Sequence, residues 1–128
     1  MSSPKKQALV RYIEAVAKGD ADGIRSVVTE DYTHHFLGTT VLAGTRSLSD
    51  ILAQLEAFTS ALVKPAEFTF DLIVEEGDIV SAMFSGKCEL VNGNRFDGDY
   101  AVFCRFRGDK ILAMHELIDT KLADAVLV

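Results

Sequence analysis

Two adjacent histidines and one late carboxylate are the residues of this chain best suited to acid/base chemistry. His34 and His35 lie in the segment YTHHF, and Glu116 lies between Met114 and Ile118 in an apolar stretch. Histidine titrates near neutral pH and is the commonest general base. A carboxylate is costly to bury among apolar neighbours without a partner. This combination favours a site that moves protons on a bound molecule.

The two histidines point to opposite faces if their segment is extended, so only one of them can enter a pocket. We assign the general base to His35, with His34 as the alternative, and either one is also typical of a surface or capping histidine. Side chains on opposite faces cannot share an ion, so no metal site is expected. The alternative role for Glu116 is an ion pair with Lys87 or Arg105 across a sheet.

The spacing of apolar residues indicates the elements that carry these side chains. Helical spacing predicts a helix ended by Gly19, a short helix capped by Asp20, and a third helix that opens on a capping box at Ser47. A proline follows the third helix and closes that region. The expected ranges are a helix at 5–18, an extended segment at 32–37, a loop at 38–44, and strands at 67–75, 79–91, 95–107 and 110–119.

Helices followed by an antiparallel meander define an α+β domain, and we expect one domain over residues 1–128. One strongly curved, mainly antiparallel sheet wrapped around three N-terminal helices would leave a conical pocket. The late strands carry apolar residues at both parities, as in sheets that are covered on both faces. We therefore expect a homodimer through the outer sheet face, to which we assign Phe84, Cys88, Leu90, Tyr100, Val102, Cys104 and Phe106.

Composition limits the partners. The chain has 13 basic and 19 acidic residues, a net charge of −6, and no basic stripe, so nucleic acid is not expected. Its apolar stretches fall short of the roughly 20 residues that span a bilayer, and its start lacks the apolar core of a signal peptide, so no membrane contact is expected. Cys88 and Cys104 lack metal-ligand spacing and are typical of buried thiols in a reducing cytoplasm.

Two phrases identify a family resemblance. RYIEAVAKGDADGI at 11–24 and RFRGDKILAMHELIDT at 105–120, together with the order of elements, resemble the SnoaL-like and ketosteroid-isomerase-like branch of the nuclear-transport-factor-2-like superfamily. The resemblance covers nearly the whole chain and implies a cone-shaped, cystatin-like fold. Members include isomerases, polyketide cyclases, epoxide hydrolases, dehydratases and binding proteins without catalysis, so the fold alone does not select a reaction.

The resemblance also implies roles for single residues. Tyr12 matches the oxyanion-donating tyrosine of ketosteroid isomerases, and Asp99 falls near their protonated aspartic acid. Their general-base aspartate falls at 34–36, where this chain has histidines. In limonene epoxide hydrolases the catalytic aspartate of the last strand matches Glu116, and the water-positioning tyrosine falls near His34. The arginine of those hydrolases has no match in the middle strand.

The sequence therefore predicts a cofactor-free acid/base enzyme acting on a small apolar organic molecule, as an isomerase, a polyketide-cyclase-like enzyme or a hydrolase or dehydratase. His35 would be the base, Glu116 a second acid/base or an orienting group, and Tyr12 and Asp99 donors to developing negative charge. Tyr12 is also typical of a core tyrosine, and Asp99 of a solvated turn. The expected pocket lining is Phe36, Phe58, Met83, Lys87, Phe103, Met114 and Ile118.

The alternative is a ligand-binding or assembly module of the same fold, without catalysis. An enzyme is expected to hold a histidine within hydrogen-bond reach of Glu116 or Asp99. A binding module is expected to neutralise these carboxylates with Lys87 or Arg105.

Overall fold

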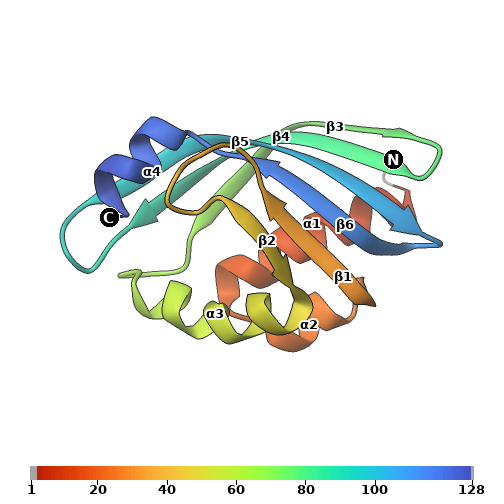
Figure 1. Cartoon of the computed structure of the whole chain (residues 1–128), viewed down its shortest axis with the longest axis horizontal. Helices are drawn as coiled ribbons and strands as arrows, with labels where there is room; N and C mark the ends of the chain where they lie inside the picture. The colour runs from red at the N-terminus through yellow and green to blue at the C-terminus, as the bar shows by residue number, and fades with distance from the viewer. Residues whose placement is uncertain (1–2, 128) are drawn as a thin grey trace.

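Three helices lie against the concave face of a curved six-stranded sheet in the computed structural model, which describes residues 3–127 (Figure 1). The sheet has the strand order β2-β1-β6-β5-β4-β3, and all neighbouring strands are antiparallel except β1 and β6. The expected α+β, cone-shaped fold is confirmed. The elements are α1 (Pro4–Lys18), α2 (Ala21–Arg25), β1 (Val28–Phe36), β2 (Gly44–Ser47), α3 (Leu48–Ser60), β3 (Glu67–Glu76), β4 (Ile79–Glu89), β5 (Arg95–Arg107), β6 (Lys110–Leu117) and α4 (Thr120–Val126).

The helix ends are fixed by the residues that the sequence indicates. Gly19 ends α1 in the left-handed region at φ 70°, and the Asp20 side chain accepts the Gly23 N–H to begin α2. Ser47 and Asp50 form both hydrogen bonds of a capping box at the start of α3. Of the helices within residues 3–127, none has the length and apolar character needed to cross a bilayer.

Two elements are absent from the sequence-based prediction. Strand β2, with the sequence GTRS, lies at the end of the expected loop and pairs with β1 along the sheet edge. Helix α4 lies in the C-terminal tail and is capped by Asp119. Strand β2 carries no periodic apolar pattern, and α4 has only seven residues, so its apolar face of Leu122, Ala123 and Val126 covers little more than one turn.

The assignment of the two faces of β4 and β5 from the sequence is wrong. The residues assigned to the outer face instead lie on the inner face, against the helices. Both parities of the late strands are apolar, so alternation alone cannot tell which face the helices cover. Phe84, Cys88, Leu90, Val102, Cys104 and Phe106 are buried in this core, and Tyr100 is partly buried.

The outer face carries a different apolar set in two adjacent rows across the strands. One row runs Leu72, Met83, Ala101, Leu117, and the next contains Val74, Ser81, Phe103 and His115. Five of these side chains, Leu72, Val74, Met83, Phe103 and Leu117, are between 42% and 53% exposed. We call these five residues the outer patch.

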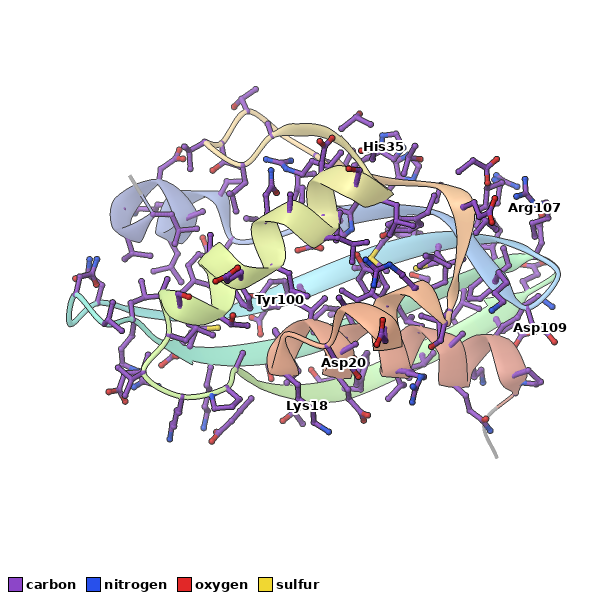
Figure 2. The ribbon with its side chains drawn as sticks, turned by 90° about the horizontal axis from the view of Figure 1, so that it is seen from below. Lys18, Asp20, His35, Tyr100, Arg107 and Asp109 are labelled. Carbon is purple, nitrogen blue, oxygen red and sulfur yellow. The ribbon has the colours of Figure 1, made fainter. Side chains whose placement is uncertain are left out.

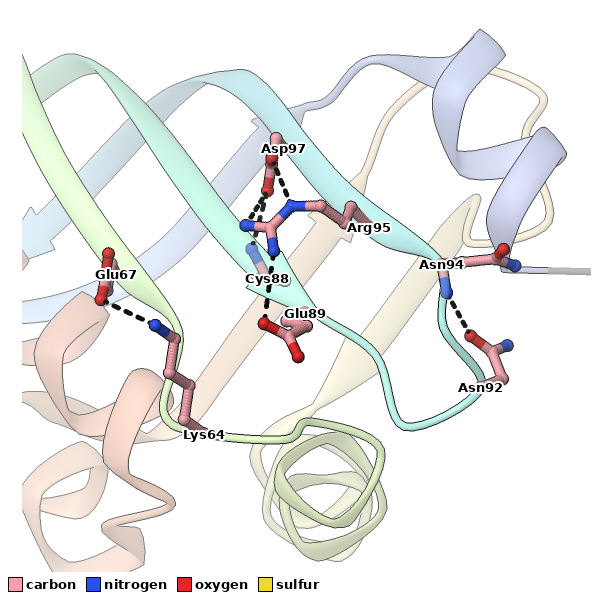
Figure 3. A network of polar contacts seen from close by, with 8 residues as sticks. All are labelled: Lys64, Glu67, Cys88, Glu89, Asn92, Asn94, Arg95 and Asp97. Carbon is pink, nitrogen blue, oxygen red and sulfur yellow. Dashed lines mark hydrogen bonds and ion pairs between the residues drawn. The ribbon is translucent and has the colours of Figure 1, made fainter.

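Charged side chains join the ends of β4 and β5 near α4 (Figure 3). The Arg95 guanidinium donates to Asp97 at 2.8 Å and to Glu89 at 3.4 Å, and Asp97 also accepts the backbone N–H of Cys88. The hydrogen bond from Arg95 holds the pKa of Asp97 below its ordinary value. These groups are exposed, so they contribute little to the stability of the fold.

Candidate active site

A cavity of about 570 Å³ lies between the inner face of the sheet and helices α1 and α3. One wall of this cavity is aromatic. The rings of Phe84 and Tyr100 stack with their centres 4.9 Å apart, and the Phe68 ring lies edge-on to both. Gly86 lies beneath these rings, because a Cβ there would come within 2.7 Å of Phe68. A mostly apolar cavity of this size suits a small organic ligand.

His34 is the histidine that faces this cavity, and it is 3% exposed. Its Nδ1 lies 2.8 Å from the Tyr32 hydroxyl and 3.2 Å from the Tyr12 hydroxyl. Its Nε2 lies 2.9 Å from Oε1 of Glu116. Strands β1 and β6 run parallel with Phe36 opposite Glu116, so His34 and Glu116 come from neighbouring positions on one sheet face.

The hydroxyls of Tyr12 and Tyr32 determine which ring nitrogen of His34 carries a proton. Burial raises the pKa of both Tyr12 and Tyr32 well above the ordinary tyrosine value, so both stay protonated at neutral pH. The Tyr32 hydroxyl donates to the Tyr12 hydroxyl at 3.1 Å, and the Tyr12 hydrogen then has Nδ1 of His34 as its acceptor at 3.2 Å. The remaining proton of a neutral His34 is then on Nε2 and points at Glu116.

Glu116 presents one carboxylate oxygen to His34 and leaves the other open to the cavity. Its side chain is 12% exposed, and Oε2 has no hydrogen bond to any residue within 3–127. A carboxylate that is oriented through one oxygen and free at the other can take up or release a proton at a bound substrate. A carboxylate in this arrangement can serve as a general base that a histidine orients.

His35 lies on the opposite face of β1 and does not line the cavity, so the histidine expected to enter the pocket is His34 instead. Its ring stacks on His115 at 4.3 Å, and its two nitrogens lie 3.0 Å from the hydroxyls of Thr33 and Thr45. Figure 2 shows His35 at the margin of the molecule, whereas Tyr100 lies between helices α1 and α3. Burial, followed by the neighbouring His115, lowers the pKa of His35.

The other expected site residues divide between the two faces of the sheet. Tyr12 joins His34 and Glu116, while Asp99 is exposed on the outer face opposite Ser85 and does not reach the cavity. The expected ion pair of Glu116 with Lys87 or Arg105 does not form, because both side chains lie on the outer face. Of the expected lining, Phe36, Phe58 and Ile118 line the cavity and Met114 is buried on the inner face, but Met83, Lys87 and Phe103 lie on the outer face.

Two residues of the site, one behind His34 and one in the cavity wall, are not singled out by the sequence. Tyr32 shares the parity of His34 and Phe36 in one strand, which is a signal that could have indicated it. Arg46 lies in β2, which looks like a loop in the sequence, so its position beside His34 follows only from the pairing of β1 and β2.

Metal ligands do not cluster in the part of the chain that is described. Over residues 3–127, no group of three or more His, Cys, Asp or Glu side chains is placed to hold a metal ion.

The sequence comparison identifies one family. The model of the SnoaL-like domain matches residues 9–114. A search of curated proteins finds no match.

Solved structures share the fold over almost the whole chain. A nuclear-transport-factor-2-like protein from Burkholderia xenovorans is 25% identical, with 98% of this chain and 95% of that chain covered and a TM-score of 0.74. TerC, co-crystallised with polyporic acid, is 20% identical, with 98% of both chains covered and a TM-score of 0.82. A protein from Acidithiobacillus ferrooxidans, described provisionally as a polyketide cyclase, is 15% identical, with 95% and 92% covered and a TM-score of 0.77.

Proposed function

We propose that this chain, which belongs to the SnoaL-like domain family, is a cofactor-free acid/base enzyme that moves a proton on a small, mostly apolar organic substrate. One observation carries the proposal: Glu116 faces an apolar cavity with Oε1 held by His34 and Oε2 free. Among the described residues, Thr29 Oγ1 is the one fully buried polar side-chain atom without a partner, so Oε2 of Glu116 is accessible from the cavity to a bound molecule.

The proposed step begins with a substrate carbon that lies next to a carbonyl group. Oε2 of Glu116 takes the proton from this carbon, the C–H bond breaks, and its electron pair moves onto the carbonyl oxygen as an enolate. Glu116, now a carboxylic acid, returns the proton to the same carbon or to another carbon of the conjugated system. Exchange, isomerisation and ring closure through the enolate all begin with this transfer.

His34 keeps the carboxylate in position during the transfer. Its Nε2–H donates to Oε1, which leaves Oε2 as the atom that reacts, and Tyr12 fixes the tautomer by donating to Nδ1. Tyr32 donates to the Tyr12 hydroxyl and lies 2.8 Å from the same nitrogen. In this scheme Tyr12 and Tyr32 are positioning residues, because they act through the imidazole.

The aromatic wall favours a substrate with a flat ring. Two of the similar structures support a substrate with a ring, since one was co-crystallised with polyporic acid and another is described provisionally as a polyketide cyclase. A ring packed against Phe68, Phe84 and Tyr100 would exclude water around Glu116.

A panel of small cyclic ketones, enones, lactones and epoxides tests this function. Each compound is incubated with the protein in D₂O and followed by proton NMR, which detects exchange at carbon, isomerisation and ring opening together. We expect catalysed exchange or isomerisation of at least one ring ketone or enone. If such compounds bind saturably and none reacts, the non-catalytic binding module replaces the enzyme.

We also propose that the protein is a homodimer through the outer patch. Five partly exposed apolar side chains on one sheet face, Leu72, Val74, Met83, Phe103 and Leu117, form a surface that a second copy would cover. Cys88 and Cys104 are free thiols, which fits a reducing cytoplasm as the proposed location.

A further inference from the structure

Arg46 places a cation in the cavity wall beside the histidine–carboxylate pair. Strand β2 pairs with β1 so that Arg46 lies directly opposite His34, and cross-strand partners share one face of the sheet. The guanidinium carbon lies 4.6 Å from the centre of the Phe36 ring, which in turn stacks on His34 at 4.5 Å. Arg46 and Glu116 therefore flank Phe36 in the wall of one cavity.

The guanidinium is fixed in place by backbone oxygens. Nη1 of Arg46 donates to the carbonyl oxygen of Leu42 at 2.7 Å and approaches that of Gly44 at 3.5 Å. Within residues 3–127, no hydrogen bond is made by Nε or Nη2. Two donors of a rigid, planar fork thus remain for a ligand.

The charge of Arg46 has no carboxylate partner in the part of the chain that is described. Four other arginines, Arg25, Arg95, Arg105 and Arg107, each have a carboxylate oxygen within 3.5 Å. Asp50 is near enough to feel the Arg46 charge, but its carboxylate bonds to Ser47 and its pKa is lowered mainly by those bonds. A partly buried cation beside an apolar cavity is stabilised by an anion that enters it.

We infer that the substrate is a flat apolar ring compound that carries a carboxylate, which the free donors of Arg46 bind. This inference names the substrate class for the proposed function, and its catalytic part rests on that function. The ring lies against Phe84 and Tyr100, and the carboxylate is kept away from Glu116 by like charge. Arg46 attracts the carboxylate end of the substrate and Glu116 repels it, so the opposite end of the substrate lies next to Glu116.

Binding of 2-naphthoate and 2-naphthamide, measured by isothermal titration calorimetry at pH 7, tests the inference without relying on turnover. The two probes share a ring system and differ in charge. We expect the wild-type protein to bind 2-naphthoate about tenfold more tightly or better, because a charge-assisted bidentate pair is worth that much. Arg46→Gln should remove this preference and leave the affinity for 2-naphthamide unchanged.

Two further variants keep the test decisive. Arg46→Lys retains the charge without the planar fork and should retain only part of the preference, and Arg25→Gln, at an exposed arginine on α2, should leave both affinities unchanged. Equal wild-type affinities for the two probes, or no binding of either, would overturn the inference even if Arg46→Gln failed to fold. Proton exchange on neutral ring ketones is measured separately, so the failure of this inference and the failure of the proposed function can be told apart.

Discussion

Nε2 of His34 lies 2.9 Å from Oε1 of Glu116, although the two residues are 82 positions apart in the chain. The parallel pairing of β1 with β6 produces this contact, since it aligns Phe36 with Glu116 and His34 with Met114 on the inner face. The contact leaves one oxygen of Glu116 free within an apolar cavity. The predictions below follow from this contact, the hydroxyls behind it and the opposite face of the same strands.

Replacing each of the two adjacent histidines tests which one serves the site. His34→Leu should reduce turnover by about 10²-fold or more, because a leucine side chain cannot donate to Glu116 and orient it. His35→Gln should change turnover less than about twofold, because His35 lies on the outer face. Steady-state kinetics on the best substrate of the panel measures both. A larger loss from His35→Gln would contradict the assignment.

The two tyrosines behind His34 should act as alternatives for one another. Tyr32→Phe leaves Tyr12 able to donate to Nδ1, so we expect a loss of about 1 kcal/mol in the free energy of unfolding. The double variant with Tyr12→Phe leaves the buried nitrogen without a donor and should cost more than the sum of the single variants. Urea denaturation of the four proteins measures this coupling. Additive losses would show that the hydroxyls do not share the nitrogen.

Turnover of Tyr32→Phe separates a positioning role from a structural one. Tyr32 does not line the cavity, so the substrate should bind with unchanged KM while kcat falls. A rise in KM with constant kcat would place the effect on the cavity shape instead.

His35 should stay neutral at pH 7 and become protonated only at lower pH. Its folded-state pKa lies below the ordinary 6.5 because of burial and the adjacent His115. The unfolded chain therefore binds this proton more readily, so His35 contributes stability above about pH 6.5 that is lost as the pH falls through its folded-state pKa. NMR titration of the imidazole signals measures the pKa directly. His115→Gln should bring the value closer to 6.5, and a midpoint above 6.5 in the wild type would contradict the prediction.

A charged substitution in the outer patch should change the oligomeric state of the protein. Phe103→Asp puts a charge between two apolar rows and should convert the dimer to a monomer with the cavity intact. Glu76→Gln, at an exposed position of β3, is the matched control and should leave the dimer unchanged. Sedimentation equilibrium measures both masses. A wild-type monomer at high concentration would refute the proposed dimer.

Local signals predict much of this fold from the sequence. The capping box at Ser47, the left-handed Gly19 and the glycine turns depend on neighbouring residues, so they can be recognised without the tertiary structure. Strand β2 was not predicted because backbone pairing with β1 holds it in place, and this pairing leaves no pattern of apolar residues in the sequence. Arg46 was missed for the same reason.

The candidate site is harder to predict because it depends on which face of each strand meets the helices. Alternation places His34 and His35 on opposite faces but does not identify the inner one. The same ambiguity put Met83 and Phe103 in the expected pocket and Tyr100 outside it. Glu116 was correctly expected to face inward, although its partner is His34 and not Lys87 or Arg105.

The rate of carbon–deuterium exchange catalysed by Glu116→Gln tests the central claim most directly. The substrate is the ring ketone or enone that the wild-type protein exchanges fastest in D₂O, and Glu76→Gln serves as the control for carboxylate loss elsewhere. The variant keeps the side-chain shape and can still accept from His34, but it cannot take up the proton. We predict a fall of about 10²–10⁴-fold in kcat for Glu116→Gln with unchanged substrate affinity, and no change for Glu76→Gln. Exchange by Glu116→Gln at the wild-type rate would contradict the assignment of Glu116 as the base.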